Sequence, residues 1–208
     1  MIYPKNNTFI FWFFNRYVKW LVGKHFHEVL FNPIAIDKNK SILLIANHFS
    51  FWEALILFCV NERLFKKKFH VMILEETAKK EPILKYAGAF SVSKNSRDIL
   101  QSLDYAAGLL NDPQNLVLIF PQGKLYPNFV SHIYFEKGIS RIIKQAQGSF
   151  QLVFAATFVQ YFKHKNQTAT VYLKTGDNDF ADKPVAELQN AYQQHYNASK
   201  QLQTEIDI

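Results

Sequence analysis

A histidine and a glutamate five residues apart carry the chemistry that this sequence suggests. His48 comes two residues after the apolar run 42–46, and Glu53 lies in a segment that continues as a helix. In open α/β sheets, functional groups gather where a strand ends and the next helix begins. An imidazole is an effective general base near neutral pH when a carboxylate holds its other ring nitrogen. If the helix begins near Ser50, Glu53 falls in its first turn and faces His48, with Asn47 or Ser50 available as the cap.

Strands that alternate with helices are predicted from the apolar runs and turn residues between positions 41 and 203. Strands are predicted at 41–46, 69–74, 89–93, 116–120, 151–160 and 168–175. Helices are predicted at 52–64, 77–86, 98–110, 134–146 and 184–203, with Pro82 interrupting the second. The continuous β-prone run 116–120 is typical of a strand that is buried on both faces. We therefore expect one α/β domain, with a mixed, mostly parallel central sheet and helices on both faces.

Composition limits the partners that this chain can have. With 208 residues and 49% hydrophobic side chains, the chain is long enough to bury a substantial core. Its net charge of +7 is spread along the sequence, which favours an anionic membrane surface or phosphorylated substrates over nucleic acid. The single cysteine, Cys59, lies in an apolar run and reads as a buried hydrophobe in a reducing compartment. The pair His25 and His27 lacks further ligands at a convincing spacing, so no metal site is expected.

The first 30 residues are predicted to form a helical segment at a membrane interface. An aromatic stretch begins at residues 9–14, but Asn15, Arg16 and Lys19 interrupt it well short of the ~20 apolar residues that a spanning helix needs. Large aromatic side chains mixed with basic ones suit a helix that lies in the lipid headgroup layer. The alternative is an ordinary helix packed on the domain. The chain is accordingly divided into an interfacial segment, 1–30, and an α/β domain, 31–208.

Five segments resemble, in order and spacing, the conserved blocks of the glycerolipid acyltransferases, the lysophosphatidic acid acyltransferase-like family. The family blocks are Asn-His with an aspartate five residues after the histidine, a glycine before an apolar strand and a basic residue, Phe-Pro-Glu-Gly, Phe-Lys-x-Gly, and a last apolar strand. The corresponding segments here are Asn47-His48 with Glu53, 88–94, Phe120-Pro121-Gln122-Gly123, Phe135-Glu136-Lys137-Gly138, and 152–158. Any one of these matches is weak, but together they are specific. They cover roughly residues 41–159.

The resemblance implies transfer of a fatty acyl group from a thioester, either acyl-CoA or acyl-carrier protein, to a hydroxyl of a lysolipid or other membrane lipid. It implies that His48 is the general base, that Glu53 orients it, and that no acyl-enzyme forms and no cofactor is needed. Backbone N–H groups near residues 121–123 would stabilise the oxyanion, and Lys94 would bind an anionic head group. The residues expected to contact substrate are Ser93, Lys94, Phe120, Pro121, Gln122, Gly123 and Lys124. The expected location is peripheral, on the cytoplasmic face of the cell membrane.

Three positions in the first and third segments depart from the family pattern. Glu53 replaces an aspartate, Gln122 replaces a glutamate, and Leu125 stands where arginine is usual, with Lys124 as the neighbouring cation. The loss of both charges argues against a pocket for lysophosphatidic acid and points to a lyso-aminolipid, a glycosylated lipid or another membrane alcohol. Two alternatives stay open. One is a catalytically inactive relative that binds lipid, and the other is an acyl-thioester hydrolase in which His48 activates water.

Overall fold

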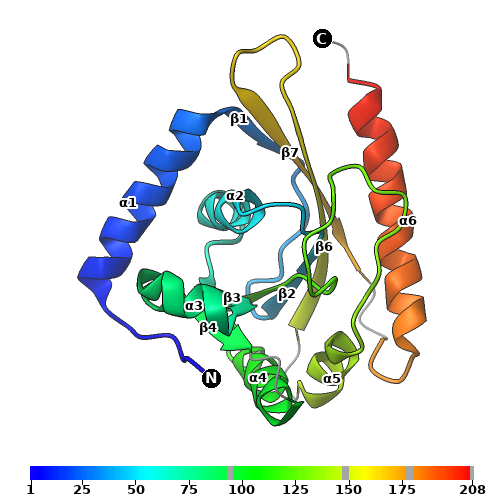
Figure 1. Cartoon of the computed structure of the whole chain (residues 1–208). Coiled ribbons are helices and arrows are strands. Elements are labelled where there is room, and N and C mark those ends of the chain that lie inside the picture. The colour runs from blue at the N-terminus through cyan, green and yellow to red at the C-terminus, as the bar shows by residue number, and fades with distance from the viewer. Residues whose placement is uncertain (93–95, 147–149, 177–179, 207–208) are drawn as a thin grey trace.

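A seven-stranded sheet forms the centre of the molecule, in the order β1-β7-β6-β2-β5-β3-β4 (Figure 1). This computed structural model describes all residues except 93–95, 147–149, 177–179 and 207–208. The strands are β1 (Phe26–Phe31), β2 (Ser41–Ala46), β3 (Lys68–Leu74), β4 (Ala89–Val92), β5 (Asn115–Ile119), β6 (Phe150–Gln160) and β7 (Gln167–Thr175). The helical elements are α1 (Thr8–His25), α2 (Trp52–Val60), η1 (Asn61–Phe65), α3 (Glu75–Lys80), η2 (Pro82–Ala87), α4 (Ser96–Leu109), α5 (Gly138–Gln145) and α6 (Val185–Thr204).

Most neighbouring strands of the sheet are parallel. Strands β6, β2, β5, β3 and β4 run in one direction. Strand β7 returns antiparallel to β6 after the polar turn at 161–166, and β1 then lies parallel to β7. The prediction of a mixed, mostly parallel sheet is therefore confirmed.

Two hydrophobic cores lie on opposite faces of the sheet, and strand β2 contributes to both. Ile42, Leu44 and Ala46 face a core that includes side chains of α1 and α2. Leu43 and Ile45 face the other core, which includes side chains of α5 and α6. Figure 1 shows the sheet between these two groups of helices. A central strand that is covered on both faces needs apolar residues at every position, which explains the unbroken run 42–46.

The N-terminal segment differs from its predicted form. Asn7 Oδ1 accepts a hydrogen bond from the Ile10 N–H at 3.0 Å and so caps α1, but the helix ends at His25. Residues 26–31 form the edge strand β1 instead of continuing the helix that was predicted for 1–30. The buried positions of β1 do not alternate strictly, so the sequence pattern alone does not predict this strand, which is held by its pairing with β7.

Other elements keep their predicted positions with changes at their ends. The helix predicted at 52–64 is α2 followed by one π-helical turn, η1. The helix predicted at 77–86 divides into α3 and the 3-10 turn η2, because Pro82 cannot donate to the preceding turn. Helix α5 begins at Gly138, four residues later than predicted.

His195 on α6 makes stability depend on pH. Its side chain is buried, Nε2 lies 3.0 Å from the Tyr172 carbonyl oxygen, and burial lowers the pKa of this imidazole to about 4. Between the ordinary pKa of ~6.5 and this value, the unfolded chain binds a proton that the folded chain does not, so stability falls as the pH falls through that window. The largest loss from this one group is about 3 kcal/mol.

We expect His195→Gln to remove part of this pH dependence, because the amide retains a donor for the Tyr172 carbonyl but does not titrate. Urea unfolding at about pH 7 and about pH 4.5 measures the difference in the free energy of unfolding. The wild type should lose more stability over this interval than the variant. Equal losses would show that His195 does not contribute.

Candidate active site

The ends of β2 and β5 bring two distant loops together. These strands are parallel neighbours, with Ile45 aligned to Ile119. The chain therefore leaves the sheet at the same edge in both cases, first toward His48 and then toward the turn at 120–123. This is the carboxyl edge of the parallel strands, where open α/β sheets hold their ligands.

The Glu53 side chain is fully buried and satisfied by local donors. Its Oε1 accepts the backbone N–H of Phe49 at 2.8 Å and also that of Ser50. Its Oε2 lies 3.2 Å from His48 Nδ1. Ser50 Oγ accepts the Trp52 N–H at 3.0 Å, which makes Ser50 the residue that helps to start α2. The loop 48–52 thus wraps around one carboxylate, as the predicted pairing of His48 with Glu53 requires.

The geometry assigns the imidazole tautomer. An ionised carboxylate can only accept hydrogen bonds, so Nδ1 of His48 carries the proton and donates it to Glu53. Nε2 is then the basic nitrogen. Because the His48 side chain is 27% exposed while Glu53 is 0% exposed, the histidine is the member of the pair that a ligand can reach.

Three contacts from the turn after β5 hold His48 in place. The His48 backbone N–H donates to Gln122 Oε1 at 2.6 Å, and the His48 carbonyl accepts the Tyr126 N–H at 3.0 Å. The Phe120 ring stacks on the imidazole, with the centroids 4.2 Å apart and the planes 19° from parallel. Phe120 and Gln122, which were predicted to contact substrate, therefore contact the histidine itself.

Gln122 also has an unused donor. The side chain is 3% exposed, and Nε2 is buried with no hydrogen-bond partner among the described residues. Because Oε1 is occupied by the His48 N–H, the amide cannot turn over without losing that bond. A buried N–H without a partner costs about 1–3 kcal/mol, and such groups gather where a ligand or water completes them.

Asn47 joins β2 to β6 beyond the end of their ladder. Its Nδ2 donates to the Thr157 carbonyl at 3.0 Å, and its Oδ1 accepts the Thr157 N–H at 2.8 Å. This side chain imitates a backbone pair, so it anchors the chain just before His48 instead of capping the helix. Tyr192 on α6 supports the same region by donating its hydroxyl to the Ala155 carbonyl at 2.8 Å.

Gly123 has a backbone conformation that favours glycine. Its φ is +66°, and an added Cβ would lie 3.0 Å from Cγ of Glu136. The left-handed backbone and this close approach both disfavour a side chain at this position. The exposed Glu136 is therefore packed over the turn, and its own N–H donates to the Pro121 carbonyl at 2.8 Å. Lys124 is exposed, with Nζ 5.2 Å from the centre of the Tyr126 ring.

The remaining site predictions have mixed outcomes. The structure brings His48, Glu53, Phe120, Pro121, Gln122, Gly123 and Lys124 into the two loops described above. Ser93 and Lys94 lie outside the described residues. Cys59 is buried, and burial raises the pKa of its thiol to about 11, which agrees with its interpretation as a buried hydrophobe.

Comparison with known proteins assigns the family. The model of the family described as Acyltransferase matches residues 29–159. The chain belongs to this acyltransferase family, and the resemblance to glycerolipid acyltransferases is confirmed. The fold is similar to that of the 1-acyl-sn-glycerophosphate (LPA) acyltransferase PlsC from Thermotoga maritima. That structure aligns with a TM-score of 0.63 at 12% identity, over 89% of this chain and 76% of the other. Among proteins of curated function, none matches the sequence.

We expect Glu53→Ala to destabilise the fold, because it leaves the partly buried N–H groups of Phe49 and Ser50 without their acceptor. The loss should be about 2–4 kcal/mol, measured as the shift in free energy of unfolding from urea titrations. Glu76→Ala on α3 removes an exposed carboxylate and serves as the control, with an expected change within about 0.5 kcal/mol. Equal effects of the two substitutions would contradict a structural role for the buried carboxylate.

Proposed function

We propose that this chain transfers a fatty acyl group from a thioester to a hydroxyl of a membrane lipid, with His48 as the general base. The observation that carries the proposal is the contact between the partly exposed His48 imidazole and the buried Glu53 carboxylate. The carboxylate sets the tautomer that leaves Nε2 basic, and it stabilises the imidazolium that forms when Nε2 accepts a proton.

The reaction balances without a covalent enzyme intermediate. Nε2 of His48 takes the proton of the lipid hydroxyl while its oxygen attacks the thioester carbonyl. The tetrahedral intermediate collapses, a new C–O bond replaces the C–S bond, and the imidazolium returns the proton to the departing thiolate. The donor is acyl-CoA or acyl-carrier protein, since both present the same thioester.

We assign the side-chain amide of Gln122 as the hydrogen-bond donor to the carbonyl oxygen of the thioester. Its Nε2 has no partner among the described residues, while its Oε1 accepts the backbone N–H of His48. A donor in such a place stabilises negative charge as it develops on the carbonyl oxygen, and removal of a comparable donor typically lowers the rate ~10²–10³-fold.

The acceptor that fits best carries no phosphate monoester. The turn has Gln122 in place of the family glutamate and Leu125 in place of arginine, while Glu136 stands at the lysine of the Phe-Lys-x-Gly segment. Glu136 packs directly over Gly123 and forms no ion pair within the described part of the chain. An acidic group beside the turn repels a phosphate and favours an ammonium or hydroxyl head group. We therefore favour a lyso-aminolipid, a glycosylated lipid or another membrane alcohol.

We expect His48→Ala to lower acyl transfer by ~10²–10⁴-fold, the range typical of a lost general base. The assay follows radiolabelled acyl thioester, as CoA and as carrier-protein conjugates, into lysolipid acceptors with and without a phosphate monoester. His27→Ala is the matched control, because this exposed histidine lies on β1 and should leave the rate unchanged.

The same assay separates the alternatives. Release of free fatty acid without acylated lipid would identify a thioester hydrolase that uses His48 to activate water. Binding of lipid without either product would identify an inactive relative. Full acyl transfer by the His48→Ala variant would reject the proposed base.

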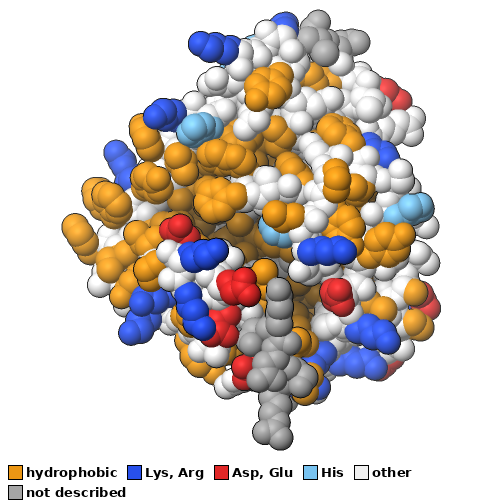
Figure 2. Space-filling view, viewed as in Figure 1, with side chains coloured by type: hydrophobic (Ala, Val, Ile, Leu, Met, Phe, Trp, Pro, Cys, Tyr) orange, Lys and Arg blue, Asp and Glu red, His pale blue; other side chains and the backbone are white. Residues whose placement is uncertain are grey.

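Membrane attachment through α1 is the second part of the proposal. The side chains of Phe9, Trp12 and Trp20 are 75%, 58% and 56% exposed, although they belong to a helix whose other face packs on the core. Arg16 lies 6.0 Å from the Trp12 ring centre, and Lys24 lies 5.0 Å from that of Trp20. Figure 2 shows apolar and basic side chains mixed along the flank where α1 runs.

This composition suits the headgroup layer, where rings insert and cations meet anionic lipid. No helix in the ranges that the structure describes is both long and apolar enough to cross a membrane. We infer a peripheral location on the cytoplasmic face of the cell membrane, where acceptor lipids meet soluble thioesters.

We expect the double substitution Trp12→Ser and Trp20→Ser to weaken sedimentation with phosphatidylglycerol vesicles at least tenfold, because two half-exposed rings lose their burial in lipid. The control is Tyr134→Ser with Leu202→Ser, which removes two comparably exposed apolar side chains on the side of α6. Equal vesicle binding by the two double variants would reject α1 as the attachment surface.

A further inference from the structure

The segment that follows the turn after β5 lies beside the active site. Residues 126–136, here called the strap, form neither helix nor strand and run along α6, in light green in Figure 1. At the start of the strap, the Tyr126 N–H donates to the His48 carbonyl at 3.0 Å. At its end, the Glu136 N–H donates to the Pro121 carbonyl at 2.8 Å. Both ends of the strap are therefore bound to the loops that hold the histidine.

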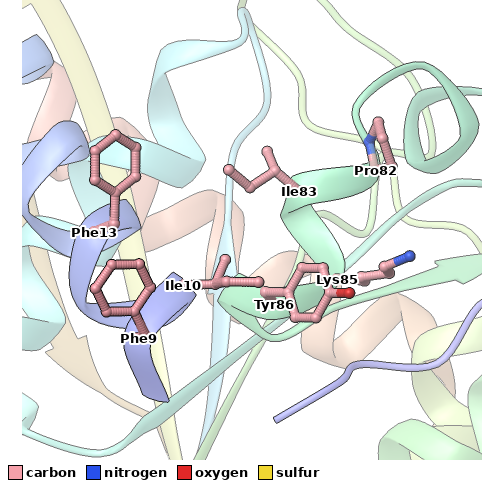
Figure 3. A pocket seen from close by; sticks show the side chains of 7 residues that line it. All are labelled: Phe9, Ile10, Phe13, Pro82, Ile83, Lys85 and Tyr86. Carbon is pink, nitrogen blue, oxygen red and sulfur yellow. The ribbon is translucent and has the colours of Figure 1, made fainter. Parts of the chain in front are cut away.

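An open groove on the same molecule lies in a different place. It has a volume of about 380 Å³ between α1 and η2, and its lining includes the apolar side chains of Phe13 and Ile83 (Figure 3). None of the residues that line it belongs to the strap or to the loops around His48. A lipid head group at His48 is therefore bordered by the strap and the turn, and not by this groove.

Two glutamines of α6 bind the backbone of the strap. Gln189 Oε1 accepts the Phe135 N–H at 3.0 Å. Gln193 Oε1 accepts the Ile133 N–H at 2.8 Å, and its Nε2 donates to the Ser131 carbonyl at 3.1 Å. These contacts involve every second residue of the strap, and they are made by two side chains that are one helical turn apart.

The spacing of the two glutamines matches an extended chain. Side chains four residues apart lie on one face of a helix and are about 6 Å apart along its axis. Two residues of extended backbone span about 6.6 Å. A pair of amides on α6 can therefore bind alternate N–H groups of the strap, which runs antiparallel to the helix. The glutamine-rich sequence of α6 thus serves to bind this segment.

Apolar contacts hold the same segment. Ile133 is 1% exposed and lies in the core on the α5 and α6 side of the sheet. The centre of the Phe135 ring lies 5.4 Å from that of the Tyr192 ring on α6. Nearer the start of the strap, Phe129 stacks on Phe158 of β6 with the ring centres 5.1 Å apart. These contacts and the glutamine hydrogen bonds together determine where the last residue of the strap lies.

That last residue carries a negative charge to the active-site turn. Glu136 packs over Gly123, where an added Cβ would lie 3.0 Å from Cγ and 3.6 Å from Oε1 of the glutamate. Phe135, which Gln189 binds, is the residue directly before it. A shift of the Phe135 backbone therefore moves the carboxylate relative to the turn that contacts His48.

We propose that Gln189 is a positioning residue for acceptor selectivity. It holds Phe135 so that the Glu136 carboxylate stays over the turn, where it favours an ammonium or hydroxyl head group over a phosphate monoester. Gln193 supports the same path of the strap one helical turn away. The proposal rests on the proposed acyl transfer and on the acceptor preference assigned above to Glu136, and it adds the residue that maintains this preference.

Amide hydrogen exchange, followed by NMR on the full chain, tests the contact without an assay of activity. Gln189→Met keeps the length of the side chain and removes its acceptor, whereas Gln189→Glu retains an acceptor. We expect the Phe135 N–H to exchange about tenfold faster in Gln189→Met and within about twofold of the wild-type rate in Gln189→Glu. Gln194→Met is the matched control and should leave this rate unchanged, because Gln194 is exposed on the same helix.

Acceptor kinetics test the consequence. Lysophosphatidylethanolamine carries an ammonium group and lysophosphatidic acid carries a phosphate monoester, and the ratio of their kcat/KM values measures selectivity. We expect Gln189→Met to lower this ratio about fivefold, through a higher KM for the ammonium acceptor with kcat within about twofold. Gln189→Glu and Gln194→Met should keep the wild-type ratio.

A double-mutant cycle links Gln189 to Glu136. Glu136→Gln removes the charge and should lower the acceptor ratio by about the same factor as Gln189→Met. Because Gln189 acts on selectivity only through that charge, the variant that combines the two substitutions should lose nothing further. A general loosening of the fold would instead add to the effect of Glu136→Gln.

Three outcomes overturn the proposal. They are wild-type exchange of the Phe135 N–H in Gln189→Met, an unchanged acceptor ratio in that variant, and additive losses in the double variant. If the wild type transfers acyl groups and one of these outcomes is found, only the positioning role is rejected. A wild type that transfers to no lysolipid rejects the proposed function and the selectivity role with it, while the exchange rates separately show whether Gln189 holds the strap.

Discussion

A buried carboxylate organises this site. Glu53 has no contact with solvent, and a carboxylate in that environment is tolerated only when it is hydrogen-bonded by nearby donors. Two backbone N–H groups of the preceding loop and one imidazole meet that demand. The loop 48–52 consequently has little freedom, because a change in its path would leave the charge unsatisfied. The contact with the buried Glu53 carboxylate therefore fixes the orientation of the His48 ring.

The extra methylene of glutamate is accommodated by the same arrangement. The side chain reaches back from the first turn of α2 far enough for one oxygen to cover two consecutive N–H groups while the other faces the ring. A second set of contacts, from Gln122 and Phe120, holds the histidine from the neighbouring strand end. In this chain, Gln122 thus combines a structural role toward the backbone of His48 with an amide donor that has no partner.

Local sequence was sufficient to predict the parts of the site that depend on short-range contacts. The run 42–46 is apolar because both sheet faces are covered, and the pairing of Glu53 with His48 lies within one loop and one helical turn. Contacts between distant segments were not predictable in this way. The bond from Gln122 to His48 joins residues 74 apart in sequence, and Asn47 pairs with Thr157 across 110 residues. The sequence around an asparagine or glutamine does not indicate which distant group its amide will bind. Strand β1 was likewise not predictable, because it is stabilised by its pairing with β7 more than by its own sequence.

The first 31 residues pass from one edge of the sheet to the other. Residues 2–5 lie along β4 and η2, α1 crosses the face of the sheet, and β1 then pairs with β7 at the opposite edge. One continuous segment therefore contacts the edge of β4 and pairs with β7, and open strand edges are sites where strands of other molecules can pair. Loss of residues 1–31 would expose the edges of β4 and β7 together, so the segments on either side of the helix proposed to meet lipid also limit edge-to-edge association between molecules.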